Sequence, residues 1–448
     1  MNTLLAGFAR VDITPQLGID MEGYYKVRKA DGVLDPLQAN ALALSCGSTR
    51  IVLMSLDLCI LPTSLVPILK KSICQRTGLP EQAVHIHVTH THTGPVVKPE
   101  WEDMLVQQYI AQLQEKLAEA AEGALADLKT AKLGFGVGQA PNIAFVRRYR
   151  MKDGSVKTNP GVNNPDIVAP IGRADEQVNV LRLDQKDGKS IVLVNYGNHP
   201  DTVGGCGISA DWPGFVRSTV ERALENTKCI FFNGAQGDVN HVNVHPKGGD
   251  LNGMYMDFDD VSRGYAHAKH MGQVVAGAVL QVYEKVLYTD VPAVKLMDKT
   301  IQVPSNMPKP EDMPTAYHIH ELYAAGRDAE LPYEGMELTT KVAEAERMIR
   351  LEHGPESFSM TLSAVAVGPI AFMLIPGEPF TGVGRGLKQT EGFDLILPCC
   401  CTDGYEGYFP MQDSYAEGGY EAKSSPYAEG VAELIVAEGK MLLDSLKG

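Results

Sequence analysis

The chain has 448 residues, of which 44% are hydrophobic and 21% are charged, so it can bury a sizeable core. Its formal net charge is −15 and no cluster of Lys and Arg offsets it, which argues against binding to nucleic acid or to an anionic membrane surface. No apolar run approaches the roughly 20 residues that span a bilayer. The first residues lack the charged and apolar regions of a signal peptide, and the eight cysteines include no C-x-x-C pair. We therefore expect a cytoplasmic protein with reduced thiols.

Short apolar segments alternate with segments of helical periodicity along most of the chain. The expected strands are 4–12, 40–46, 51–57, 83–89, 132–137, 177–184, 190–196, 228–233, 293–303, 358–367, 370–375 and 394–398. The expected helices are 64–76, 101–129, 213–227, 261–287, 338–352, 379–390 and 428–446. This interleaving predicts an α/β fold, a layered sandwich of mixed β-sheets flanked by helices, in a single large domain over residues 1–448.

Two stretches interrupt the alternation. Residues 242–260 are rich in Gly, Asn and Asp, and residues 304–337 contain five prolines. Long segments of this kind in compact domains are often loops or lids over a functional site. We expect that role for both stretches.

The segment 83–95 contains four histidines in eight residues. Apolar and polar residues alternate over 84–89, which is typical of a strand, and a Gly-Pro pair ends it. His90 and His92 therefore lie at a strand end, where α/β proteins usually bind ligands. Neutral imidazole is a good zinc ligand, so the pattern predicts a metal site. Histidines that only line a polar strand face are the alternative.

Two other apolar strands are followed by a side chain that can bind a metal. The strand at 190–196 is followed by His199, and the strand at 370–375 is followed by Glu378. A catalytic zinc site needs three protein ligands and an open position, which these residues could complete with His90. The residues after His92 do not continue as in a metallo-β-lactamase. An amidohydrolase barrel is also disfavoured, because three apparent strands precede the histidine pair.

Several short segments occur together in one order along nearly the whole chain. They are Ala9-Arg10-Val11-Asp12-Ile13-Thr14-Pro15, Thr89-His90-Thr91-His92-Thr93-Gly94-Pro95, Asn198-His199-Pro200, Asn233-Gly234-Ala235-Gln236-Gly237-Asp238-Val239-Asn240, Pro376-Gly377-Glu378, Glu406-Gly407-Tyr408 and Gly419-Tyr420-Glu421. In these segments the chain resembles the N-terminal, catalytic domain of the neutral ceramidases, also called neutral/alkaline non-lysosomal ceramidases.

The resemblance implies one zinc ion with four protein ligands, which are His90, His199, Glu378 and Tyr408. It also implies catalytic residues beside the metal, which are His92, Tyr420 and either Arg147, our first choice, or Arg148. The implied activity is hydrolysis of an amide, in which zinc activates water, hydrogen-bond donors stabilise the oxyanion and His92 transfers a proton. Manganese, iron or nickel would also suit such ligands.

We count Asn240 among the expected catalytic residues, although the chain departs from the family pattern there: Asn240 stands where the family has a serine that contacts the scissile group. Asparagine can donate and accept hydrogen bonds but cannot replace a hydroxyl in proton transfer. The family's C-terminal immunoglobulin-like domain is expected to be absent, as is a signal segment. We therefore expect a small, polar substrate, such as a sugar-derived or N-acyl compound, in place of ceramide. The oligomeric state stays open.

Three interpretations of function follow. The first is a zinc-dependent hydrolase that cleaves the C–N amide bond of a small molecule. The second is a metal-dependent lactonase, lyase or isomerase acting on a polyhydroxylated substrate. The third is a non-catalytic relative that only binds a ligand. His318 and His320 repeat the His-x-His spacing away from any strand end, and we expect them to be structural.

Overall fold

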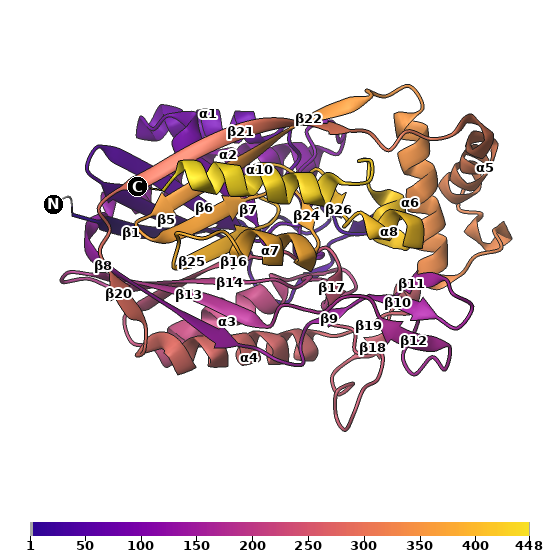
Figure 1. Cartoon of the computed structure of the whole chain (residues 1–448), viewed down its shortest axis with the longest axis horizontal. Helices are drawn as coiled ribbons and strands as arrows, with labels where there is room; N and C mark the ends of the chain where they lie inside the picture. The colour runs from indigo at the N-terminus through magenta and orange to yellow at the C-terminus, as the bar shows by residue number, and fades with distance from the viewer. Residues whose placement is uncertain (1–2, 448) are drawn as a thin grey trace.

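The computed structural model describes residues 3–447, which form four layers (Figure 1). A nine-stranded sheet and a four-stranded sheet pack face to face, and helices cover the outer face of each sheet. The predicted α/β sandwich of mixed sheets flanked by helices is therefore confirmed.

The nine-stranded sheet has the order β16-β14-β13-β8-β1-β5-β6-β7, with β20 paired to β8. Its strands are β1 (Leu5–Asp12), β5 (Gln38–Cys46), β6 (Thr49–Leu56), β7 (Val84–Val88), β8 (Lys129–Gln139), β13 (Gln177–Gln185), β14 (Ser190–Tyr196), β16 (Thr227–Asn233) and β20 (Leu287–Thr289). The sheet is mixed, because β6 and β7, and β14 and β16, pair in parallel while its other pairs are antiparallel.

The four-stranded sheet has the order β21-β22-β23-β25. Its strands are β21 (Val294–Pro304), β22 (Ser357–Val367), β23 (Ile370–Leu374) and β25 (Leu395–Cys399). Phe8 and Leu193 of the larger sheet share one buried cluster with Phe372 and Leu397 of the smaller sheet. Burial of both sheet faces explains why β23 and β25 read as continuous apolar runs in the sequence.

Six helices form the outer layers. Four of them cover the larger sheet and two cover the smaller one: α1 (Val66–Thr77), α2 (Met104–Ala126), α3 (Asp211–Ala223) and α4 (Tyr265–Tyr283), then α7 (Thr381–Lys388) and α10 (Val431–Ser445). Asp103 caps α2 by accepting a hydrogen bond from the amide of Leu105 (2.7 Å). Asp211 is the first residue of α3, and its carboxylate accepts from the amides of Val203 and Trp212.

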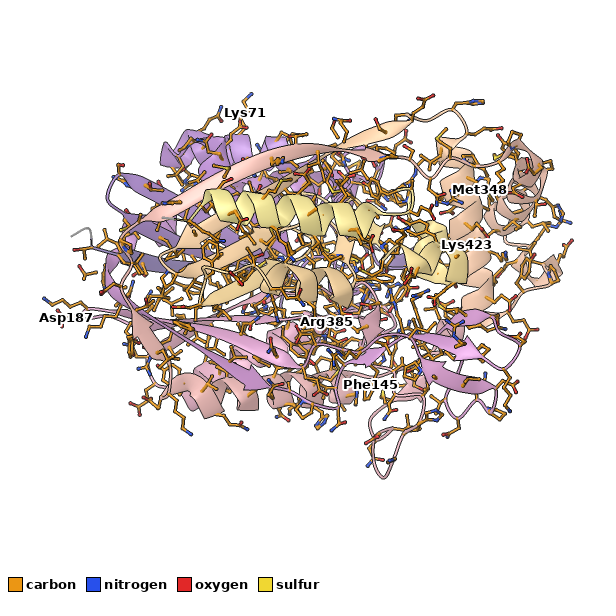
Figure 2. The ribbon with its side chains drawn as sticks, viewed as in Figure 1. Lys71, Phe145, Asp187, Met348, Arg385 and Lys423 are labelled. Carbon is orange, nitrogen blue, oxygen red and sulfur yellow. The ribbon has the colours of Figure 1, made fainter. Side chains whose placement is uncertain are left out.

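A second group of helices lies at one end of the sandwich (Figure 1). These are α5 (Met313–Ala324), α6 (Gly335–Leu351), α8 (Asp413–Glu417) and α9 (Tyr420–Ser424). Helix α5 lies inside the stretch 304–337, where we expected loops because of the prolines. Pro314 stands in the first turn of α5, where a missing N–H costs nothing, so this proline starts the helix. Figure 2 labels Met348 of α6 and Lys423 of α9 at this end, and Lys423 forms an ion pair with Glu344 of α6 (3.0 Å).

Shorter strands form small sheets apart from the two main ones and were not predicted, because most of them are too short to show a periodicity. They are β2 (Asp20–Met21), β3 (Arg28–Lys29), β4 (Gly32–Val33), β9 (Phe145–Val146), β10 (Arg148–Met151), β11 (Val156–Thr158), β12 (Ile167–Pro170), β15 (Gly207–Ile208), β17 (Val239–Asn240), β18 (Tyr255–Met256), β19 (Ser262–Arg263), β24 (Glu378–Pro379) and β26 (Tyr408–Phe409). Among the described helices, none is both long and apolar enough to cross a membrane.

Candidate metal centre

Asn233, at the end of β16, joins the strand ends that carry the candidate ligands. Its backbone amide donates to His87 Nε2 on β7 (3.0 Å). Strands β16 and β7 stand at opposite ends of the sheet order, and this hydrogen bond joins them. Its side-chain amide donates to the carbonyl oxygens of Thr89 (3.1 Å) and Asn198 (3.0 Å). These two residues directly precede His90 and His199, so one asparagine fixes the backbone before both histidines.

His90 is held in one ring orientation. Its Nδ1 lies 2.7 Å from the carbonyl oxygen of Cys59 and donates to it, which leaves Nε2 with a lone pair. The backbone of His90 has a φ of 73°, an uncommon value for a residue with a side chain, and its amide donates to Leu58 (2.9 Å). Such an anchored ring, with one nitrogen directed at a carbonyl, is the usual setting of a metal-ligating histidine.

His199 and Glu378 complete a compact group with His90. His199 Nδ1 lies 3.1 Å from the carbonyl oxygen of Gln236, so its Nε2 is also left as an acceptor. Glu378 Oε2 lies 3.0 Å from His199 Nε2 and 3.3 Å from His90 Nε2. All three side chains are buried, and one ligand atom from each lies within 4.8 Å of the others.

These residues fit a divalent cation. Glu378 Oε2 is buried without a hydrogen-bond donor, because both neighbouring Nε2 atoms belong to rings that donate through Nδ1 to carbonyls. Burial opposes the charge on Glu378, yet the two histidines hold its pKa well below the usual value. The carboxylate thus favours a positive charge at this point, and two imidazoles with one carboxylate form a zinc-type donor set.

A second possible group consists of Cys59, His90 and His92. Burial raises the pKa of the Cys59 thiol well above its usual value, which favours the thiol over the thiolate that binds metals. The group with Glu378 is therefore the better candidate. His92 Nε2 lies 3.3 Å from His90 Nε2, so His92 stands next to this group in either case.

Tyr408 approaches the same group through the pairing of β24 with β26. Its register partner is Glu378, and its hydroxyl lies 3.4 Å from His199 Nε2. Tyr405 was not predicted as part of the site, although it lies in the same Gly- and Tyr-rich loop. Its hydroxyl donates to the other carboxylate oxygen of Glu378, Oε1, across 2.6 Å. Tyr405 therefore orients the carboxylate.

Arg147, rather than Arg148, faces this group. The Arg147 guanidinium lies over the rings of Tyr408 (5.4 Å) and Tyr420 (6.0 Å). Its Nε donates to Glu421 across 2.6 Å, and both side chains are buried. Arg148 turns away and donates to Ser414, Glu417 and the carbonyl of Gly418.

Asn240 does not reach the ligand group directly. Its side-chain amide donates to Asn159 Oδ1 (3.1 Å), and its own Oδ1 accepts from the amide of Val242 (3.0 Å). Asn159 in turn lines the cavity described next. The structure therefore places Asn240 behind the cavity wall, one residue removed from it.

A cavity of about 440 Å³ opens beside the ligand group. Four predicted site residues line it: His92, Arg147, Tyr408 and Tyr420. The rest of its wall includes Tyr24, Tyr25, Lys26, Arg28, Asn159, Asp201, Asp259, Val261, Arg263, Tyr323, Met336, Leu338 and Thr339. Asp259 comes from the stretch 242–260, and Tyr323 and Met336 come from 304–337. Both stretches therefore reach the cavity, and their action as lids stays a prediction.

A larger and more open depression of about 790 Å³ lies elsewhere, between the β9 segment and α7. Phe145 and Arg385, labelled in Figure 2, line it. It contains none of the predicted site residues, so its size does not make it the better candidate.

Comparison with solved structures matches the whole chain to neutral ceramidases. This chain superposes on the neutral ceramidase from Pseudomonas aeruginosa with a TM-score of 0.72 and 16% sequence identity. The match covers 100% of this chain and 76% of the ceramidase chain. A ceramidase complexed with C2 gives a TM-score of 0.72 and 15% identity with the same coverage. No family model and no curated protein sequence matches the chain. The chain thus has a ceramidase-like fold.

Proposed function

We propose that this chain is a zinc-dependent hydrolase that cleaves a C–N amide bond in a small, polar molecule. The observation that carries the proposal is the buried Glu378 Oε2, which has no donor and lies within 3.3 Å of Nε2 of both His90 and His199. In this proposal His90, His199 and Glu378 hold the ion, with Tyr408 as a fourth ligand. The ceramidase-like fold supports the same chemistry.

The residues around the cavity suit amide hydrolysis. When bound, zinc supplies Lewis acidity and makes water nucleophilic near neutral pH. Arg147 and Tyr420 both line the cavity and can donate to the oxyanion that develops on the scissile carbonyl, a contribution of about 3 kcal/mol per donor. Burial lowers the pKa of His92 well below its usual value, so its neutral ring can take a proton from the attacking water and then pass it to the leaving amine. The hydroxyl of water joins the carbonyl carbon as the C–N bond breaks.

The limited size of the cavity, and the charged groups in its wall, favour a small substrate with polar groups over a long-chain lipid. The wall's only aliphatic or thioether side chains are Val261, Met336 and Leu338, and the remaining side chains are charged, amide, hydroxyl or aromatic groups. Ligand pockets of a few hundred Å³ enclose compounds of drug-like size. An N-acyl compound with a short acyl group fits this description.

The test measures zinc per chain by inductively coupled plasma mass spectrometry in the wild type and in His90→Ala and His199→Ala. We expect about one zinc in the wild type and a large loss in each variant. His318→Ala is the matched control, because His318 belongs to an exposed His-x-His pair on α5. Stoichiometric zinc in both site variants would contradict the proposal.

Labelled water then separates hydrolysis from other metal-assisted reactions. The zinc-loaded protein is incubated with a panel of N-acyl amino acids and N-acyl amino sugars in H₂¹⁸O. Hydrolysis places one solvent oxygen in the released acid. A product without solvent oxygen would favour the lyase or isomerase interpretation, and tight binding without turnover would favour a non-catalytic protein.

A further inference from the structure

Arg28 lines the cavity beside His92 but was not predicted as a site residue. Its guanidinium donates to three backbone carbonyls: Nη2 to His92 (2.6 Å) and Glu22 (2.8 Å), and Nη1 to Gly205. Its Nε is buried without a hydrogen-bond partner. A guanidinium has five N–H donors, so two remain after these three contacts.

No carboxylate neutralises Arg28 among the described ion pairs. The groups that act most on its charge are Tyr24, Cys206, Cys59 and Arg263, and burial lowers its pKa. The other cations of the cavity differ in this respect. Arg147 pairs with Glu421 (2.6 Å), Lys26 pairs with Asp328 (3.0 Å), and Arg263 lies among aspartates. Among these cavity cations, Arg28 is therefore the one for which the described part of the chain provides no carboxylate partner.

The position of Arg28 is fixed relative to the candidate metal ligands. Its guanidinium stacks over the ring of Tyr24 (4.2 Å), and the ring of Tyr24 meets the ring of His92 edge-on (5.2 Å). Gly23 has a φ of +112°, and a side chain there would collide with His92, so the loop lies directly against that histidine. The guanidinium is thus held close to His92 before any ligand arrives, which lowers the cost of binding one.

We propose that Arg28 binds a carboxylate on the substrate, so that the centre acts on small amides that also carry a carboxylate near the scissile bond. A guanidinium N–H and a carboxylate oxygen form a charge-assisted hydrogen bond, which is stronger than a bond between neutral groups. The proposal rests on the function proposed above and names its substrate class. The carboxylate is unchanged in the reaction, in which water still adds across the C–N bond and the amine leaves with a proton.

The test uses hydroxamic acids, which bind zinc through the hydroxamate group, on the zinc-loaded full chain. Malonic, succinic and glutaric monohydroxamic acids carry a carboxylate at increasing distance. Propano-, butano- and pentanohydroxamic acids are their uncharged partners. Isothermal titration calorimetry gives the affinity ratio of each pair. For at least one length we expect the carboxylate to bind about 10-fold tighter or more, as a charge-assisted hydrogen bond provides.

Arg28→Gln should reduce that ratio to less than about 2-fold, and Arg28→Lys should leave an intermediate ratio, because a lysine keeps the charge but not the planar group with its fixed N–H directions. Arg327→Gln is the control. It removes an exposed arginine that pairs with Glu330 outside the cavity and should leave the ratio as in the wild type. If Arg28→Gln does not fold, a ratio in Arg28→Lys at least about 3-fold below the wild type supports the proposal.

Two outcomes would overturn the proposed role of Arg28, and they differ in what they leave standing. Zinc-dependent binding of the uncharged hydroxamates with no preference for a carboxylate, or with a preference that survives in the Arg28 variants, removes the role of Arg28 and leaves the metal centre standing. Absence of zinc-dependent binding for every hydroxamate removes the proposed function as well.

Discussion

Arg147 Nε donates to Glu421 Oε1 across 2.6 Å, and 6% and 0% of these two side chains are exposed. Loss of one partner from a buried ion pair leaves an uncompensated charge, which typically costs about 3–5 kcal/mol. We expect Glu421→Ala to lower the free energy of unfolding by about this amount in urea titrations. Glu330→Ala is the control. Glu330 pairs with Arg327 at the surface, and loss of such a pair should cost less than about 1 kcal/mol. Equal effects in the two variants would show that Arg147 is solvated.

The stability of the fold should fall in acid partly because of His87. Burial lowers the pKa of His87 from the ordinary histidine value of 6.5 to about 3. His87 Nδ1 donates to the carbonyl of Cys400 and its Nε2 accepts from Asn233, so a proton on Nε2 would break the second contact. Between pH 6.5 and 3 the unfolded chain binds a proton that the folded chain does not. This linkage lowers stability by up to about 1.4 kcal/mol per pH unit as the pH falls.

His87→Gln isolates this contribution. The variant should be less stable than the wild type at neutral pH, because it loses the ring contacts. It cannot take up the proton, so the difference in unfolding free energy between wild type and variant should narrow as the pH falls from 6 to 4. Chemical denaturation of both proteins at several pH values measures this difference in unfolding free energy. His353→Gln, at a side chain that is 92% exposed, should differ from the wild type by a constant amount. A constant difference for His87→Gln as well would contradict the assignment.

The layers and the strand-end residues of this fold could be predicted from the sequence, because both depend on local patterns. Alternation over 84–89 marked β7, and the apolar run before Glu378 marked β23. Helix α5 was missed because prolines were interpreted as loop residues, whereas Pro314 occupies a first helical turn. Proline breaks a helix in its interior but is favourable in its first turn, so a proline can mark the start of a helix as well as a loop.

The candidate site was predictable only where a strand end carried its ligand. His90, His199 and Glu378 met that condition, whereas Tyr408 came from the family resemblance. Arg28 and Tyr405 had no local signal. Arg28 acquires its role from the carbonyl of His92, 64 residues away, and Tyr405 from the carboxylate of Glu378. Contacts of this kind exist only in the folded chain. The position of Asn240 behind Asn159 is another relationship that spacing does not contain.

Tyr405→Phe should weaken metal retention without removing a ligand. The variant deletes the hydroxyl that donates to Glu378 Oε1, and loss of a group that orients a metal ligand typically lowers metal affinity 10- to 100-fold, here about 10-fold or more. Competition with a fluorescent zinc chelator gives the affinity. Tyr415→Phe is the control, because the Tyr415 hydroxyl donates to the carbonyl of Tyr427. Zinc affinity of Tyr405→Phe equal to that of the control would show that the carboxylate is oriented without Tyr405.

Tyr323→Ala should widen the range of acyl chains that the protein accepts. Tyr323 of α5 lines both the cavity beside the metal centre and a neighbouring cavity of about 580 Å³, and Tyr25 and Lys26 are the other residues common to the two walls. Removal of the ring should therefore join the two spaces. In the wild type we expect kcat/KM for N-acyl substrates to fall as the acyl chain grows from acetyl to decanoyl.

In Tyr323→Ala the same series should fall less steeply, with the largest gain at the longest chains, because the added space accepts the end of the acyl chain. Tyr317→Ala is the matched control on the same helix, since the Tyr317 side chain is exposed and lies outside both cavities. A steep series that is identical in the two variants would mean that Tyr323 does not separate the cavities in solution. A flat series in the wild type would mean that the walls yield to long chains, and the cavity would then not select a small, polar substrate.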